Sequence, residues 1–235
     1  MKTIIELKNL SKSFGGLKVL DNVSMKINEG QSVLITGPNG CGKTTLLRCI
    51  SLLENFDSGE IIICKHRVTP DTPKEEREKI IKNHLIGFVF QEPHPWYHLK
   101  VIDNLTKPLM VIKRMPKNQA LKKAGDLLDK VGLGGKKEEY PYFLSGGQKR
   151  KLIIARTLIV NPKILLLDEI SANLDRKSKE DIFRVINKVS KKKTLIIVTH
   201  ERDELKGIAH KTVRLPELPA PERIMRTAIR GKGGY

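Results

Sequence analysis

The sequence predicts an α/β fold with a parallel-sheet core, an N-terminal antiparallel β region and an inserted helical subdomain. Short apolar runs alternate along the chain with segments of helical periodicity, which is typical of a parallel sheet covered on both faces. Near the N-terminus, apolar and polar side chains alternate instead, as they do in half-buried strands. Residues 92–150 interrupt the pattern with a mostly helical stretch, which we interpret as the insertion.

The N-terminal part supplies the antiparallel region and the first core strand. Residues 3–10 and 23–27 have the alternation of strands, and Gly15-Gly16 marks a turn between them. Residues 32–36 form a short apolar run, which predicts a buried strand, and a glycine-rich turn leads from it into a helix over residues 44–53. A second strand-like pair is expected around Gly59, with residues 60–64 as one member.

Helices and core strands then alternate to about residue 215. Residues 70–84 predict a loop that runs into a helix, and residues 85–90 a buried strand. The pattern is helical from residue 93 to about residue 145, most clearly over residues 120–131. A helix at 147–160, a strand at 164–167, helical spacing over 182–189 and a last core strand at 194–199 follow.

These elements define the expected domain organisation. The core would comprise residues 1–91 and 151–215, the helical subdomain about 92–150, and a basic, proline-containing tail residues 216–235. No apolar run approaches the roughly 20 residues that cross a bilayer, so no transmembrane segment is expected.

Composition and charge narrow the class of partner. The 235 residues carry a net charge of +18, which could favour nucleic acid, an anionic membrane surface or nucleotide phosphates. Aromatic residues make up only 5%, however, and no lysine-rich run is interleaved with stacking rings, as a single-strand binder would need. We therefore interpret the lysines as a solvated exterior, not as a nucleic-acid surface. The three cysteines have no metal-ligand spacing.

The glycine-rich turn after residues 32–36 has the pattern G-x-x-x-x-G-K-[ST] of P-loop NTPases. Its glycines let backbone N–H groups point at a phosphate, and the following helix N-terminus adds positive potential. Lys43 supplies a positive charge for the β- and γ-phosphates of ATP, and the Thr44 hydroxyl is a ligand for Mg²⁺. The residues expected to bind nucleotide here are Gly37, Pro38, Asn39, Gly40, Cys41, Gly42, Lys43, Thr44 and Thr45.

Two adjacent carboxylates follow the apolar strand at 164–167. Asp168 and Glu169 come at its C-terminal end, where ligands bind in open α/β sheets. Asp168 would hold Mg²⁺, usually through water, and Glu169 would orient or deprotonate the attacking water. An acidic strand end alone is a weak signal, but together with the phosphate loop it predicts nucleotide hydrolysis.

A third motif, Leu144-Ser145-Gly146-Gly147-Gln148, resembles the signature of ABC ATPases. The resemblance runs from about residue 3 to about residue 215, with every motif in the family's order, and it implies a RecA-like core in one ABC ATPase domain. Phe14 matches the aromatic that stacks on adenine. Gln91 matches the glutamine that joins metal and water to the helical subdomain, and His200 matches the histidine that contacts the γ-phosphate.

The resemblance also implies roles and partners. Catalysis would fall to Glu169, His200, Gln91 and Lys43, and Mg²⁺ to Thr44, Gln91 and Asp168. Family members bind ATP in a head-to-tail dimer, so Ser145, Gly146, Gly147 and Gln148 of one subunit would cap the γ-phosphate held by Lys43 of the other. Residues 172–175 would contact that second subunit, which is either identical or a paired ABC ATPase. Integral membrane permease subunits and, for an importer, a solute-binding protein are the other implied partners, at the cytoplasmic face of the membrane.

Several of these residues have a purely structural alternative. Ser145 is also a good N-cap for the helix at 147–160, a role compatible with ligand binding. Phe14 could belong to the core, and Gln91 and His200 could be ordinary polar residues at strand ends. Cys41 is either a small tolerated residue or a reactive thiol, in which case maleimide would abolish ATPase activity and ATP would protect.

Two departures and one open feature concern coupling to a partner. Ile170 stands where the family usually has proline, and Asn173 where it usually has alanine, which affects the dimer loop and not nucleotide binding. Trp96 and Tyr97 follow Gln91 in the region where transporters receive a short helix of the membrane subunit. Core packing would explain these two aromatics equally well.

The stretches KPLMVIKRMPK and EEYPYFLSGGQ look most like subunits of polar amino acid importers. The leading hypothesis is therefore an ATPase subunit that energises an importer of polar amino acids or similar small solutes. An ATPase of an exporter or a cell-envelope machine, and a soluble non-transport ABC ATPase, remain as alternatives.

Overall fold

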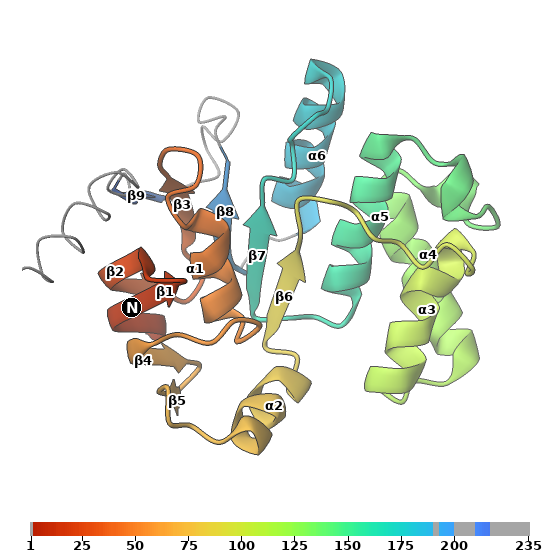
Figure 1. The fold of residues 1–235 in the computed structure, drawn as a ribbon. Coiled ribbons are helices and arrows are strands. Elements are labelled where there is room, and N and C mark those ends of the chain that lie inside the picture. The colour runs from red at the N-terminus through yellow and green to blue at the C-terminus, as the bar shows by residue number, and fades with distance from the viewer. Residues whose placement is uncertain (1, 190–192, 200–209, 217–235) are drawn as a thin grey trace, which may run out of the picture. The chain divides into compact units, whose positions relative to one another are not determined.

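The structure, a computed structural model, describes residues 2–189, 193–199 and 210–216 (Figure 1). Its described residues divide into two compact units. The first contains residues 2–29, 35–80 and 212–216, and the second residues 30–34, 81–189, 193–199 and 210–211. His200 and all of the expected tail except Pro216 lie outside the described residues.

The first unit contains an antiparallel sheet with strand order β2-β1-β4-β5. Its long hairpin consists of β1 (Thr3–Phe14) and β2 (Leu17–Asn28), joined at Gly15-Gly16 as predicted. Both strands are longer than the alternation indicated, because β-bulges shift the register along β1 and so change which face its side chains occupy. One result is that three consecutive residues of β1, from Leu10 to Lys12, are buried.

The strand pair expected around Gly59 is present, but it is centred later in the sequence. Gly59 lies inside β4 (Ser58–Ile63), and the chain reverses at Cys64-Lys65 before β5 (His66–Val68). The glycine is required for a different reason: a Cβ at this position would lie 2.5 Å from the carbonyl oxygen of Asn9, a residue of β1. Close approach of two strands, and not a turn, explains this glycine.

Two helices also belong to this part of the chain. α1 (Lys43–Ile50) follows the glycine-rich turn, contacts β2 and buries Leu46, Leu47 and Ile50. α2 (Lys74–Lys82) starts with two glutamates in its first turn, which favours the N-terminus of a helix. It buries Ile80 alone among its residues, so it is a surface helix.

The second sheet has the order β6-β7-β8-β3-β9. β6 (Ile86–Val89), β7 (Ile164–Asp168) and β8 (Thr194–Val198) pair in parallel, and every residue of β7 and β8 is buried. β3 (Ser32–Thr36) and β9 (Lys211–Arg214) complete the order, and both have residues in each unit. The sequence predicted that the strand at 194–199 is the last strand of the core. This was wrong, because β9 follows it.

The second unit contains four helices: α3 (Val101–Ile112), α4 (Lys117–Lys130), α5 (Gly146–Ile159) and α6 (Arg176–Val189). α5 and α6 pack on strands of this sheet, whereas α3 and α4 pack with α5 in a separate cluster. Two short 3-10 turns, Gly134–Lys136 and Pro141–Phe143, connect α4 to α5. Figure 1 shows α3, α4 and α5 side by side, and they share one hydrophobic cluster.

α5 belongs to two hydrophobic clusters at once. Leu152, Ala155 and Ile159 pack among α3 and α4, whereas Ile153 and Ile154 pack with β7, β8 and α6. The helix therefore crosses the boundary at residue 150 that the sequence suggested for the helical subdomain. That residues 92–150 form a separate helical subdomain stays a prediction. None of the described helices is long and apolar enough to cross a membrane.

Candidate nucleotide site

The glycine-rich turn lies between β3 and α1 in the first unit. Thr36 at the end of β3 is buried, whereas Asn39 and Gly40 at the tip of the turn are exposed. Gly42 has φ +91, and a Cβ there would lie 2.8 Å from the carbonyl oxygen of Val19 in β2. A glycine is therefore needed to bring the turn onto the β hairpin.

The N-terminus of α1 fits an anion. Gly42 is its N-cap in the left-handed conformation, no side chain caps the helix, and no acidic residue stands in the first turn. Backbone N–H groups and the positive end of the helix dipole are thus not opposed by a local carboxylate. Thr44 and Thr45 lie partly buried in the same turn. These residues have the donors that a phosphate group requires.

Lys43 is held inside the turn. Only 5% of the residue is exposed, and Nζ donates hydrogen bonds to the carbonyl oxygens of Gly37 (3.0 Å) and Pro38 (2.8 Å). A buried ammonium needs such partners, because burial without them is costly. The ammonium group of Lys43 therefore contacts the backbone of the loop that the sequence predicts to bind phosphates.

The structure shows the burial of Cys41 and Phe14, for which the sequence left alternatives open. Cys41 is buried at 3% exposure, and a Cβ at Gly37 would lie 2.6 Å from its Sγ, so the thiol packs as a small residue inside the turn. Phe14 is not a core residue: it ends β1 opposite Leu17 and is 46% exposed. An exposed ring in the same unit as the phosphate loop is available to a ligand.

The acidic pair lies at the C-terminal end of β7 in the second unit. Asp168 is 2% exposed, and Glu169 is partly exposed. Glu169 has φ +44, an uncommon backbone conformation for a residue with a side chain, and its N–H donates to the carbonyl oxygen of Val198 (2.9 Å). The backbone thus changes direction sharply at Glu169, directly after the strand.

A buried arginine holds this corner. Arg150, on α5, donates hydrogen bonds through one guanidinium nitrogen to the carbonyl oxygens of Glu169 (3.2 Å) and Ile170. It is 7% exposed, and burial lowers the pKa of its guanidinium. The sequence did not single out Arg150, because it is the middle residue of the run Lys149-Arg150-Lys151 and a charge run does not indicate which member is buried.

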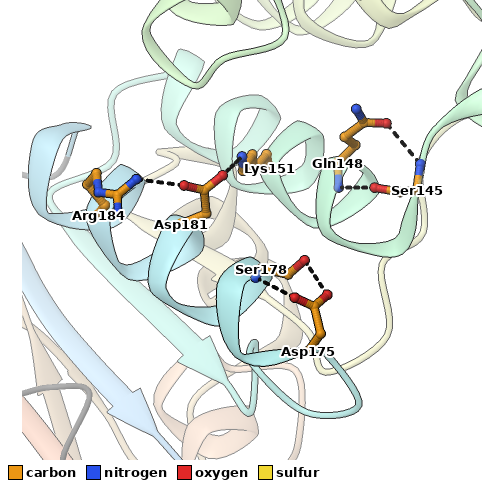
Figure 2. A network of polar contacts seen from close by, with 7 residues as sticks. All are labelled: Ser145, Gln148, Lys151, Asp175, Ser178, Asp181 and Arg184. Atoms are coloured by element: carbon orange, nitrogen blue, oxygen red, sulfur yellow. Dashed lines mark hydrogen bonds and ion pairs between the residues drawn. The ribbon is translucent and has the colours of Figure 1, made fainter.

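The signature motif forms the start of α5, and Ser145 is its N-cap as expected. Ser145 Oγ accepts from the Gln148 N–H (3.3 Å), and the Ser145 N–H donates to Gln148 Oε1 (2.9 Å), a complete capping box (Figure 2). Ser145 and Gly146 are exposed, and no acidic residue stands in the first turn. The amides of Gly146 and Gly147 belong to the first turn, where no intrahelical carbonyl is within reach. This end of α5 therefore also fits an anion.

The loop 172–175 is connected to the signature within the second unit. Asp175 accepts from the Ser178 N–H (2.9 Å) and Oγ (2.6 Å) at the start of α6, and these bonds lower the pKa of its carboxyl (Figure 2). A Cβ at Gly147 would lie 3.3 Å from Ser178 Oγ, so the signature and α6 are in close contact. Asp181, one helical turn further along α6, pairs with Lys151 of α5 (2.6 Å).

Three further positions singled out in the sequence, Gln91, Trp96 and Tyr97, follow β6. Gln91 is exposed, two residues beyond the end of β6. Trp96 and Tyr97 are half-buried: the guanidinium of Arg156 lies 4.6 Å from the Trp96 ring centroid, and the Tyr97 ring contacts the Tyr142 ring in a tilted arrangement. Each ring therefore packs against a neighbouring side chain and keeps part of its surface exposed, and a contact with a membrane subunit stays a prediction.

The structure thus groups the predicted residues by unit. Phe14, the phosphate loop and Thr44 belong to the first unit; Gln91, the signature and the acidic pair belong to the second. Within each unit, the motifs lie where a helix N-terminus or a strand end can present them to a ligand. The Thr44 hydroxyl and the Asp168 carboxylate are oxygen donors of the kind that Mg²⁺ prefers.

Comparison with known proteins agrees with these features. The family model described as "ABC transporter" matches residues 20–172. The arginine transport ATP-binding protein ArtM of Bacillus subtilis is 41% identical over 211 residues, which cover 89% of this chain and 86% of that protein. The glutamine transport ATP-binding protein GlnQ of Escherichia coli is 40% identical, covering 84% of this chain and 81% of that protein.

A solved structure gives the same result for the fold. The dimeric structure of MJ0796, a bacterial ABC transporter cassette, superposes with a TM-score of 0.79 at 33% identity, covering 90% of this chain and 94% of that one. The same cassette is also known as a dimer in a post-hydrolysis state bound to ADP and phosphate. From its three motifs, its fold and these relatives, the chain belongs to the ABC transporter family, as one of its ATP-binding subunits.

Proposed function

We propose that this chain hydrolyses MgATP between two protomers and thereby energises an importer of polar amino acids. The observation that carries the proposal is a pair of helix N-termini, those of α1 and α5. Both begin with glycine-containing turns, and both lack an acidic residue in the first turn. Two such anion sites in one chain suit a triphosphate that is held from two sides.

In this proposal each nucleotide is bound by two copies of the chain. Lys43 and the α1 N-terminus of one protomer hold the β- and γ-phosphates, and Phe14 stacks on the adenine. Ser145 with the amides of Gly146 and Gly147 of the other protomer caps the γ-phosphate. Because the capping box fixes Ser145 before any partner arrives, the second half of the site needs little ordering on closure.

Hydrolysis would use the corner at the end of β7. Glu169 orients or deprotonates the attacking water, while the charge that develops on the γ-phosphate is stabilised by Lys43 and the two helix N-termini. Thr44, Asp168 and Gln91 would hold Mg²⁺, which supplies charge neutralisation between the phosphates. Loss of the γ-phosphate removes the contact that joins the protomers, so they separate.

The transported solute is proposed from the relatives. Their names refer to arginine, cystine, methionine and glutamine transport. We infer a permease of the same class as partner, a solute-binding protein outside the membrane, and attachment of this chain to the cytoplasmic face. The partly exposed aromatics at Trp96 and Tyr97, together with Tyr142 (71% exposed), would contribute to the permease contact. The named relatives do not favour an exporter or a soluble ATPase.

The central experiment compares three variants by ATPase rate, nucleotide binding and gel filtration. Glu169→Gln should bind ATP, hydrolyse it very slowly and accumulate as a dimer. Lys43→Ala should lose nucleotide affinity, and Ser145→Arg should keep binding but fail to dimerise. Near-normal turnover in Glu169→Gln would refute the assignment of the catalytic carboxylate. A monomer at saturating MgATP, with the permease present, would refute the two-protomer site.

A further inference from the structure

Lys12 is an unusual residue in β1, because its side chain is buried next to the exposed ring of Phe14. The residue is 9% exposed, and Nζ lies 4.6 Å from the Phe14 ring centroid. A cation within about 6 Å of a ring centroid is attracted to the π face. The bulges between Leu10 and Ser13 explain the burial, since they place Lys12 on the inner side of the strand.

Two carboxylates hold the ammonium in place. Lys12 Nζ lies 3.2 Å from Glu54 Oε1 and 3.7 Å from Asp57 Oδ1. Both acids follow the C-terminal end of α1, the helix that begins at the phosphate loop. These two ion pairs oppose movement of the lysine away from the ring, and they hold its positive charge over one face of Phe14.

The backbone around the ring is tied to the same acids. The Ser13 N–H donates to Asp57 Oδ2 (2.6 Å), and the Asp57 N–H donates to the Ser11 carbonyl oxygen (2.9 Å). The end of β1 is thereby fixed to the segment after α1, although Phe14 itself is 46% exposed. A fixed ring with an exposed surface is what a stacking platform requires, because less freedom is lost when a base binds.

We propose that Lys12 is a positioning residue for the nucleobase: held by Glu54 and Asp57, it orients the Phe14 ring on which adenine stacks. This inference rests on the proposed function, since it takes Phe14 as the adenine platform. It adds that the segment after the phosphate-loop helix sets the orientation of the base-binding ring. Lys12 does not touch the phosphates in this proposal, so its contribution should depend on the base alone.

The test compares ADP with inorganic pyrophosphate, which has the two phosphates but neither the ribose nor the base. Binding of each to the purified full chain is measured by calorimetry with Mg²⁺, and neither probe is hydrolysed at the γ-phosphate. Lys12→Met keeps the apolar stem but removes the charge, and it should weaken ADP binding about three- to tenfold while pyrophosphate binding is unchanged. Lys12→Arg, which can also lie over a ring, should restore most of the ADP affinity.

The matched control is Lys8→Met. Lys8 is on the same strand and pairs with Glu60 (3.0 Å), so its loss removes an equivalent charge and should leave both affinities unchanged. Equal weakening of ADP and pyrophosphate in Lys12→Met would mean a general charge or folding effect and would overturn the inference, as would no weakening at all. Phe14→Ala tests the proposed function separately from the role of Lys12. If this variant leaves ADP affinity unchanged, the assignment of Phe14 as the adenine platform is wrong.

Discussion

Replacing Arg150 with methionine removes the guanidinium that holds the corner after β7 and keeps most of the apolar stem. Two hydrogen bonds are lost, to the carbonyl oxygens of Glu169 and Ile170. Glu169 is partly exposed, so water can replace the first bond, whereas Ile170 is fully buried and its carbonyl loses the donor. A buried polar group left without its partner costs about 1–3 kcal/mol.

An opposing effect reduces the expected loss. Methionine has no charge to bury, and among the described residues Arg150 Nε has no hydrogen-bond partner, so part of the guanidinium is buried at a cost. We therefore expect the free energy of unfolding to fall by about 2 kcal/mol. Because the corner carries Glu169, kcat for ATP should fall about tenfold or more, with ADP affinity unchanged.

The assay is urea unfolding followed by circular dichroism, together with steady-state ATPase kinetics. Lys151→Met is the matched control: its neighbouring cation pairs with Asp181, which is substantially exposed, and such a pair is worth at most about 1 kcal/mol. If Arg150→Met is no less stable than Lys151→Met and hydrolyses ATP at the same rate, the hydrogen bonds of Arg150 have no role in holding the corner after β7.

Three further predictions concern the loop, the cap and the thiols. Gly42→Ala should abolish ADP binding in calorimetry, because a Cβ would lie 2.8 Å from a backbone oxygen of β2; preserved affinity would contradict this. Ser145→Ala should lower the free energy of unfolding by about 1 kcal/mol through loss of the N-cap, whereas Ser145→Thr should retain most of it. Burial raises the pKa of the Cys49 thiol to about 12, so at pH 8 half-exposed Cys64 should be alkylated well before Cys49, as peptide mass spectrometry would reveal. Labelling of Cys49 before Cys64 would disprove this expected order of alkylation.

Motifs with a local chemical meaning were predictable from the sequence. The glycine-rich turn before α1, the acidic end of β7 and the capped start of α5 depend on neighbouring residues, so their local structures follow from short patterns. The exposed position of Phe14 and the cap at Ser145 agree with the ligand-facing interpretation.

Features that depend on distant contacts were not predictable. The strand pair was expected around Gly59, whereas this glycine lies inside β4, where it approaches the Asn9 carbonyl of a strand some fifty residues away in sequence. β9 is only four residues long and three of them are exposed or charged, so no periodicity marks it. The burial of Lys12 and Arg150 depends on bulges and on helix packing, which composition does not encode.

The two carbonyl oxygens that accept from Lys43 act as internal competitors for its charge. In the proposed function the ammonium exchanges these bonds for new ones when it turns toward a phosphate, so the net gain in affinity is smaller than the new contacts alone suggest. When a product departs, the same oxygens take the ammonium back, and no unpaired buried charge opposes release. An ATPase has to release ADP in every cycle, and these two carbonyl oxygens favour that release because they bind the lysine when no phosphate does.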